Sequence, residues 1–173
     1  MDEALSEQLM ESTPDLTADR SAHQQEHSLE VQLPFLQVVN PQARIVPIAL
    51  SDLSVDLVEQ MGDGIAATLA ELPEESRPLI VASGDMSHQI SAAEAKRRDQ
   101  YALDAMLALN PIEYFESRFR HDIPMCGHAT GAVMLHAANK LGAKSAELIH
   151  WTHSGVTTGD DHRVVSYAGV VVR

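Results

Sequence analysis

The fold is decided by residues 79–88, LIVASGDMSH, an apolar run that ends in a turn of small and polar residues. The run 79–83 is apolar without alternation, as expected for a strand that is covered on both faces of a sheet. A second run of strand length occupies residues 44–50, and two further strands are predicted at 146–152 and 164–172. Strands that alternate with helices predict an α/β fold, here a layered sandwich with a parallel or mixed central sheet flanked by helices.

Helical patterns occupy the sequence between these strands. Ser51 or Ser54 can cap a helix with a continuous apolar stripe, and Pro34 interrupts another helical pattern, which predicts a kinked or short helix there. The predicted helices are 2–12, 26–39, the stripe from Val55 to Leu72, 92–109, 111–119 and 127–141.

Composition restricts the partners. The 173 residues are the size of one domain, with 12 basic and 25 acidic residues and a net charge of −13. This charge disfavours binding to nucleic acid and to anionic lipid, so we expect neutral, cationic or metallic partners. One cysteine cannot form an internal disulfide, and no apolar stretch is long enough to span a membrane. The N-terminus is acidic where a signal peptide is basic, which predicts a cytoplasmic protein.

Asp85 and His88 form the first candidate pair, because they follow a predicted buried strand, where side chains point into a common crevice. A carboxylate next to an imidazole fixes its tautomer and raises its basicity, an arrangement used in acid–base catalysis and in support of metal ligands. The alternative is structural: Asp85 accepts backbone hydrogen bonds in an Asx turn, and His88 begins the next loop.

Cys126 is the second candidate. It lies in IPMCGH, residues 123–128, where an irregular segment meets a predicted helix. The positive end of a helix dipole favours the thiolate, the form that acts as nucleophile or metal ligand. A free cysteine is also commonly a small buried hydrophobe, so both interpretations stay open.

Glu26 and His27 open the segment 26–36, EHSLEVQLPFL. Near a helix start their side chains can project into the crevice of Asp85 and His88. Equally, Glu26 can complement the helix dipole while Ser28 acts as a cap.

Several familiar motifs are absent from the sequence. There is no paired-cysteine zinc spacing, phosphate loop, dinucleotide fingerprint, HExxH helix or serine-hydrolase elbow, so no nucleotide cofactor is expected. A hydrolase with Cys126 as nucleophile and His88 as base remains open, since such partners need not be close in sequence.

Four motifs, in order, resemble those of the Memo family, which in bacteria and archaea is called AmmeMemoRadiSam system protein B. They cover nearly the whole chain: EHSLEVQLPFL (26–36), SGDMSH (83–88), MCG (125–127), and TTGD (157–160) followed by VVSY (164–167).

The resemblance implies a fold shared with class III extradiol dioxygenases, which use non-haem iron(II) to insert oxygen into catechols. It implies that Cys126 is a metal ligand, that His88 is the acid–base residue with Asp85 beside it, and that Glu26 and His27 lie in the same crevice. Thiolate ligation favours copper or zinc relative to a site of imidazole and carboxylate, and iron is also compatible.

The sequence also departs from the family pattern. A Pro-His-Ala-Gly segment and a later histidine supply two further metal ligands in the family, and this sequence has neither. We therefore interpret residues 1–173 as the C-terminal portion of one Memo-like domain. We expect it to bind iron or copper weakly and to self-associate through an uncovered sheet edge. The family name implies a radical SAM protein and an AMMECR-like protein as partners.

A non-enzymatic alternative comes from animal relatives, which are described as adaptors for phosphorylated receptor peptides. That function requires a basic pocket that can hold a phosphate. The arginines available for one are Arg97, Arg98, Arg118, Arg120 and Arg163.

Overall fold

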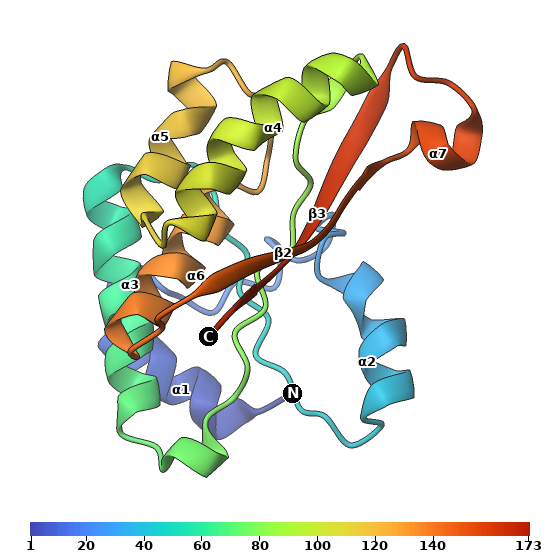
Figure 1. The fold of residues 1–173 in the computed structure, drawn as a ribbon. Helices are drawn as coiled ribbons and strands as arrows, with labels where there is room; N and C mark the ends of the chain where they lie inside the picture. Colours follow the sequence, from blue (N-terminus) through green and yellow to red (C-terminus); the bar gives the residue numbers. More distant parts are fainter.

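The computed structural model describes residues 1–173 and shows a mixed α/β fold (Figure 1). The helices are α1 (Glu3–Ser12), α2 (Leu33–Val39), α3 (Val55–Ala70), α4 (Ala92–Leu107), α5 (Pro111–Arg120), α6 (His128–Lys140) and α7 (Gly155–Thr158), with 3-10 turns at Glu30–Gln32 and Glu74–Ser76. The strands are β1 (His88–Ile90), β2 (Ala146–His153) and β3 (Val164–Val172). No helix combines the length and the apolar character that crossing a bilayer requires.

Helices α1 to α6 form close to the ranges that the sequence predicts, whereas α7 falls in none of them. Side-chain caps explain where three of the helices begin. Ser54, Ser91 and Asn110 cap α3, α4 and α5, and each side chain accepts a hydrogen bond from the backbone N–H three residues later. Pro34 lies in the first turn of α2, where its missing N–H is not needed. The predicted helix 26–39 is therefore a 3-10 turn followed by a short helix.

The sheet is antiparallel throughout, so the prediction of a parallel or mixed sheet is wrong. Its strand order is β1-β3-β2, with β3 in the centre. β2 and β3 run where the sequence places them and pair from Ala146 with Val172 to His153 with Ser166. β1 pairs with the start of β3 through His88 and Val165.

The predicted strands at 44–50 and 79–83 are extended chain outside any sheet, which corrects the sequence-based assignment. No backbone N–H of either segment donates to a backbone carbonyl. β3 pairs with β2 along one edge, whereas on its other edge β1 pairs only with Val164 and Val165, and residues 79–83 do not extend that pairing. Their apolar composition was correctly recognised, but composition does not provide a neighbouring strand.

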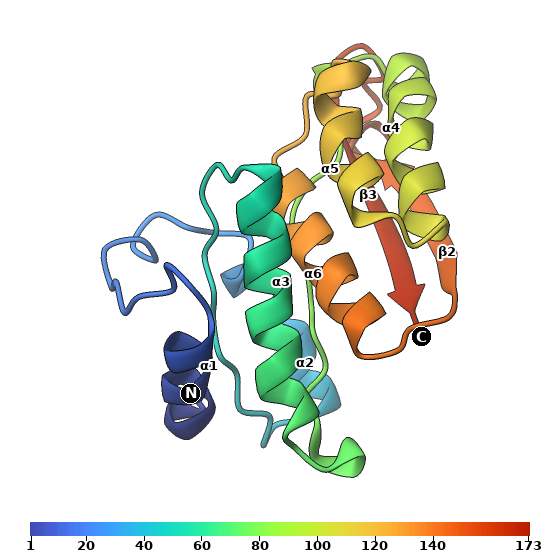
Figure 2. The same ribbon diagram turned by 90° about the vertical axis from the view of Figure 1, so that its left-hand side faces the viewer.

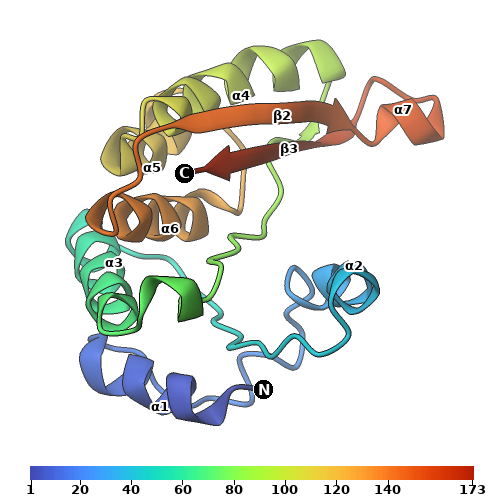
Figure 3. The ribbon, with the colours of Figure 1, turned by 60° about the horizontal axis from the view of Figure 1, so that its bottom comes forward.

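An apolar groove of about 610 Å³ runs along these two segments, and helices α1, α2, α3 and α6 line the rest of it. Figure 3 shows α2 standing apart from α3 and α6, with extended chain between them. Two apolar side chains at the groove are largely exposed, Leu79 at 84% and Val81 at 51%. Exposed apolar side chains on unpaired extended chain are a common feature of protein surfaces that associate with other polypeptide.

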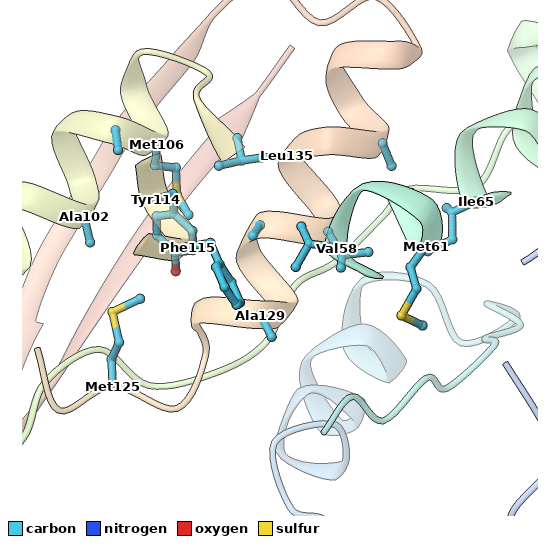
Figure 4. Close-up of a cluster of buried hydrophobic side chains, with 14 of the residues drawn as sticks. Val58, Met61, Ile65, Ala102, Met106, Tyr114, Phe115, Met125, Ala129 and Leu135 are labelled. Carbon is cyan, nitrogen blue, oxygen red and sulfur yellow. The ribbon is translucent and has the colours of Figure 1, made fainter. Parts of the chain in front are cut away.

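The core lies around α6, which packs between α3 and α5 (Figure 2). Figure 4 shows Val58 and Met61 of α3, Tyr114 and Phe115 of α5, and Leu135 of α6 in one apolar cluster, and all five are nearly inaccessible to solvent. α4 covers the sheet through contacts with all three strands. This packing fixes the start of α6, and therefore Cys126, relative to the sheet.

An ion cluster at the edge of this core gives the first prediction. The Asp63 carboxylate on α3 lies 2.8 Å from both Lys140 Nζ and His136 Nε2 on α6, and these two hydrogen bonds, that of Lys140 first, lower the pKa of Asp63. Because the Asp63 side chain is half exposed, we expect Asp63→Asn to lower the free energy of unfolding at pH 7 by only about 0.5 kcal/mol.

The difference in unfolding free energy between the protein and Asp63→Asn depends on pH in a way that follows from the lowered pKa of Asp63. A carboxylate with a lowered folded-state pKa stabilises the protein above its ordinary value of 3.8, and this stabilisation is lost as pH falls through the lower folded-state pKa. Urea unfolding of both proteins at decreasing pH measures the loss. If the two proteins still differ in unfolding free energy after Asp63 is fully protonated, the stabilisation does not come from the ionised Asp63 carboxylate.

Candidate functional site

Asp85, His88 and Cys126 are brought together at the junction of two loops, one leading into β1 and one into α6. Their ligand atoms all lie within 4.8 Å of one another. His88 Nε2 is 3.4 Å from Asp85 Oδ2 and 3.9 Å from Cys126 Sγ. Asp85 accepts no backbone N–H with its carboxylate, so it does not form the Asx turn considered as the alternative. Cys126 is exposed, so it is not a buried core thiol.

Backbone contacts hold the two loops against each other. His88 N–H donates to Pro124 O at 2.9 Å, and Gly127 N–H donates to Asp85 O at 3.4 Å. Between these bonds Gly84 and Gly127 approach so closely that a Cβ on Gly84 would lie 2.7 Å from the Gly127 Cα. Glycine is required here because two backbones meet with no space for a side chain.

The Cys126 loop is also fixed from outside the junction. Arg118 Nε, on α5, donates to the carbonyl of Met125 at 3.0 Å. Ile123 and Met125 precede Cys126 and are almost completely buried, whereas Cys126 is exposed. The thiol therefore lies at the surface at the end of an anchored segment, directly before the Gly127 cap and the first residue of α6.

A buried carboxylate, which sequence analysis missed, supports the other loop. Asp99 on α4 is inaccessible to solvent and accepts hydrogen bonds from Ser87 N–H and Oγ, at 3.2 and 2.6 Å. Ser87 lies between Asp85 and His88. A sequence signal existed: Asp99 falls in a helical stripe whose other members, Ala95, Ala102, Leu103 and Met106, are buried and apolar.

Glu26 and His27 are not among the three clustered side chains. Glu26 accepts hydrogen bonds from Ser28 N–H, Ser28 Oγ and Leu29 N–H, as a local cap does. Partial burial acts to raise the pKa of Glu26, but the hydrogen bonds from Ser28 and Leu29 outweigh it and lower the pKa. The segment does adjoin the loop of Asp85, because Ser83 Oγ donates to Ser28 O at 2.8 Å. A role for Glu26 or His27 in the site stays a prediction.

His128, two residues after Cys126, belongs to the packing around α5. Its ring lies against Phe115 and Phe119, with centroid distances of 5.1 and 5.6 Å. Burial, followed by the charge of Arg118, lowers the pKa of His128. We therefore assign this imidazole to the neutral interior and not to the exposed cluster.

Two of the separations within the cluster are close to those expected between ligands of a single cation, and all three ligand atoms lie within 4.8 Å of one another. Two atoms bound to one tetrahedral ion at about 2.0–2.3 Å are separated by about 3.5 Å. The Nε2–Oδ2 and Nε2–Sγ distances of 3.4 and 3.9 Å are close to that separation. Thiolate, imidazole and carboxylate together suit iron, copper or zinc better than magnesium or calcium.

The same geometry differs from a hydrolase triad. In such a triad the carboxylate binds Nδ1 of the imidazole while Nε2 faces the nucleophile. Here Asp85 and Cys126 both face Nε2 of His88, so the ring cannot relay a proton between them through its two nitrogens.

The five arginines considered for phosphate binding are already engaged. Arg97 and Arg98 bind Glu94, and Arg98 also binds Asp122. The other three are bound as follows: Arg118 to Met125 O, Arg120 to Glu113 and Glu116, and Arg163 to Gln89. Each of the five is therefore paired with an acceptor of the chain itself.

The fold and the cluster define an α/β protein whose candidate site lies where the loop that leads into β1 meets the N-terminus of α6. The sequence model of the family described as "Memo-like protein" matches residues 1–171. The chain therefore belongs to the Memo family.

Curated relatives agree with this assignment. A "MEMO1 family protein" of Aquifex aeolicus is 37% identical over 159 residues, which cover 91% of this chain and 58% of that protein. "MEMO1 family protein Mbar_A1422" of Methanosarcina barkeri is 35% identical over 99% of this chain and 64% of its own length. "MEMO1 family protein MJ0403" of Methanocaldococcus jannaschii is 34% identical over 99% of this chain and 60% of its length. The chain spans about three fifths of the length of these relatives.

Proposed function

We propose that this chain carries one part of the metal site, together with the acid–base pair, of a metal-dependent redox or dioxygenase-like protein that uses iron or copper. The observation that supports the proposal is the convergence of a thiol, an imidazole and a carboxylate within 4.8 Å at an exposed loop junction. Groups from residues 85–88 and 126 meet at one point, which local sequence does not require.

Each side chain has a distinct role in this proposal. Cys126 is the metal ligand, because its exposed thiol lies directly before the N-terminus of α6 and 3.9 Å from His88 Nε2. His88 holds and moves a proton at Nε2, the atom that faces both the carboxylate and the thiol. Asp85 orients the imidazole of His88 through the contact of its Oδ2 with Nε2. Iron or copper, when bound, supplies the redox chemistry.

The site in this proposal is completed by polypeptide outside residues 1–173. The relatives have about two fifths of their length beyond the match, and we propose that further ligands and sheet strands of a dioxygenase-like sandwich lie there. With Cys126 as its one protein ligand from residues 1–173, the site holds a metal ion weakly. The radical SAM and AMMECR-like proteins implied by the family name are the partners we propose for the whole protein.

Titration with Co²⁺, a spectroscopic substitute for iron or zinc, tests the proposal. We expect the 173-residue chain to bind Co²⁺ weakly with thiolate charge-transfer absorption, and Cys126→Ser to abolish that absorption. His162→Gln, which removes an exposed imidazole distant in sequence from the cluster, is the matched control and leaves binding unchanged. Tight stoichiometric binding that survives Cys126→Ser would overturn the assignment, as would the absence of any charge-transfer absorption in the original chain.

The other two functions are less well supported. A Cys–His hydrolase conflicts with the shared use of His88 Nε2. A phosphopeptide module conflicts with the engagement of all five arginines by acceptors of the chain itself.

A further inference from the structure

We propose that Asp99 is a positioning residue, which holds the turn of residues 85–88 so that His88 reaches Cys126. That Asp99 holds the turn is inferred from the hydrogen bonds of Asp99 alone. The effect of this positioning on metal binding rests on the proposed function.

Asp99 is the most completely buried acidic group of the chain, with no measurable exposure. Four donors converge on it, two on each oxygen. Oδ1 accepts from Ser87 N–H and Ser87 Oγ, at 3.2 and 2.6 Å. Oδ2 accepts from Trp151 Nε1 and Ser166 Oγ, at 2.8 and 2.5 Å. Since none of its partners is a lysine, arginine or histidine, these neutral donors are what compensates its burial.

This arrangement requires a carboxylate. Both oxygens must accept, because donors approach each of them from a different side. An amide of the same shape presents one oxygen and one NH2 group. Asp99→Asn therefore directs an N–H at the Ser87 donors or at the Trp151 and Ser166 donors, and leaves buried donors unpaired.

The hydrogen bonds lead from Asp99 directly to the candidate site. Ser87 is adjacent to His88 in sequence and two residues from Asp85. The backbone on both sides of Ser87 is tied to Ser166 of β3, by Met86 N–H to Ser166 O and Ser166 N–H to Ser87 O, both 2.9 Å. From α4, Asp99 Oδ1 accepts two further hydrogen bonds, from the N–H and the Oγ of Ser87. The turn is thus fixed from a strand and from a helix, and His88 projects from it toward Cys126.

The test compares four single variants. Asp99→Asn alters both donor pairs, Ser87→Ala removes one donor on the side of the turn, and Trp151→Phe removes one donor on the opposite side. Asp104→Asn is the matched control, because Asp104 lies on the same helix but is exposed and binds only Gln100. Amide hydrogen exchange of residues 85–90 is measured for each variant, with α3 as internal reference.

We expect Asp99→Asn and Ser87→Ala to speed exchange of residues 85–90 by about tenfold or more while α3 and the Asp104→Asn control stay unchanged. Trp151→Phe should have a smaller effect. Cobalt affinity should fall about 10- to 100-fold in the first two variants, as is usual when a group that orients a metal site is lost.

A double variant separates positioning from general destabilisation. If Asp99 acts through His88, the losses of cobalt affinity caused by Asp99→Asn and His88→Gln are not additive, whereas independent structural damage gives additive losses. Unchanged exchange in a folded Asp99→Asn protein, or additive losses, overturns the proposal. Should Asp99→Asn fail to fold, unchanged exchange in Ser87→Ala overturns it equally. Failure of the original chain to bind cobalt refutes the proposed function, while the exchange result still decides the role of Asp99.

Discussion

Replacing Gly84 with alanine is expected to remove cobalt binding and to lower the free energy of unfolding by about 1–3 kcal/mol, the usual cost of overpacking a closely packed region. The added Cβ would lie 2.7 Å from the Gly127 Cα, and neither backbone can rotate away as a side chain can. The two loops must therefore separate, which breaks the hydrogen bond from Gly127 N–H to Asp85 O. Separation of the loops moves Cys126 away from His88.

Gly169→Ala is the matched control for this prediction. Gly169 lies in β3, its backbone does not adopt a positive φ, and an added Cβ there has no neighbour within 4 Å. We expect this variant to bind cobalt and to unfold like the original protein. Urea unfolding and cobalt absorption measure both effects. Wild-type binding by Gly84→Ala would show that the loops tolerate separation and that the contact of the two glycines does not define the site.

The apolar groove leads to the second prediction of large effect, that the isolated chain self-associates. Sedimentation velocity should show oligomers whose proportion rises with protein concentration. The double substitution Leu79→Lys and Val81→Lys should shift the protein to monomer, because both side chains lie exposed on an extended segment whose backbone N–H groups pair with no other backbone.

The matched control is a double variant that introduces the same two positive charges at a surface outside the groove. Val38 and Val39 on α2 are each 84% exposed but do not line the groove. Changing both to lysine should leave the association unchanged. Equal loss of association in the two double variants would show that net charge, and not the groove, controls it. A protein that stays monomeric at all concentrations contradicts the prediction directly.

The helices were the most predictable part of the fold. The apolar stripe of α3, the serine cap at Ser54 and the proline at the start of α5 are signals carried by residues a few positions apart. The strands were less predictable. Residues 146–152 and 164–172 pair with each other, whereas the apolar run 79–83 makes no backbone hydrogen bond with a strand.

The residues of the candidate site were also predictable only in part. Asp85, His88 and Cys126 were identified from their local setting and from the family resemblance, and the structure brings their ligand atoms together. Asp99 was missed, although a charged residue in the buried stripe of α4 was a readable signal. Which donors it would meet was not readable, because Ser87, Trp151 and Ser166 come from three separate parts of the chain.

The sequence by itself determined the approximate positions of α1 to α6, which segments are apolar and extended, the acidic balance and the three candidate side chains. These properties depend on single residues or on neighbours within one or two helical turns. Only the tertiary structure decided that the sheet is antiparallel, that residues 79–83 line an open groove, that Gly84 meets Gly127, and that His88 lies 3.9 Å from a thiol 38 residues away. Strand pairing and the convergence of side chains depend on which distant segments the core packing places side by side, and no local pattern records that choice.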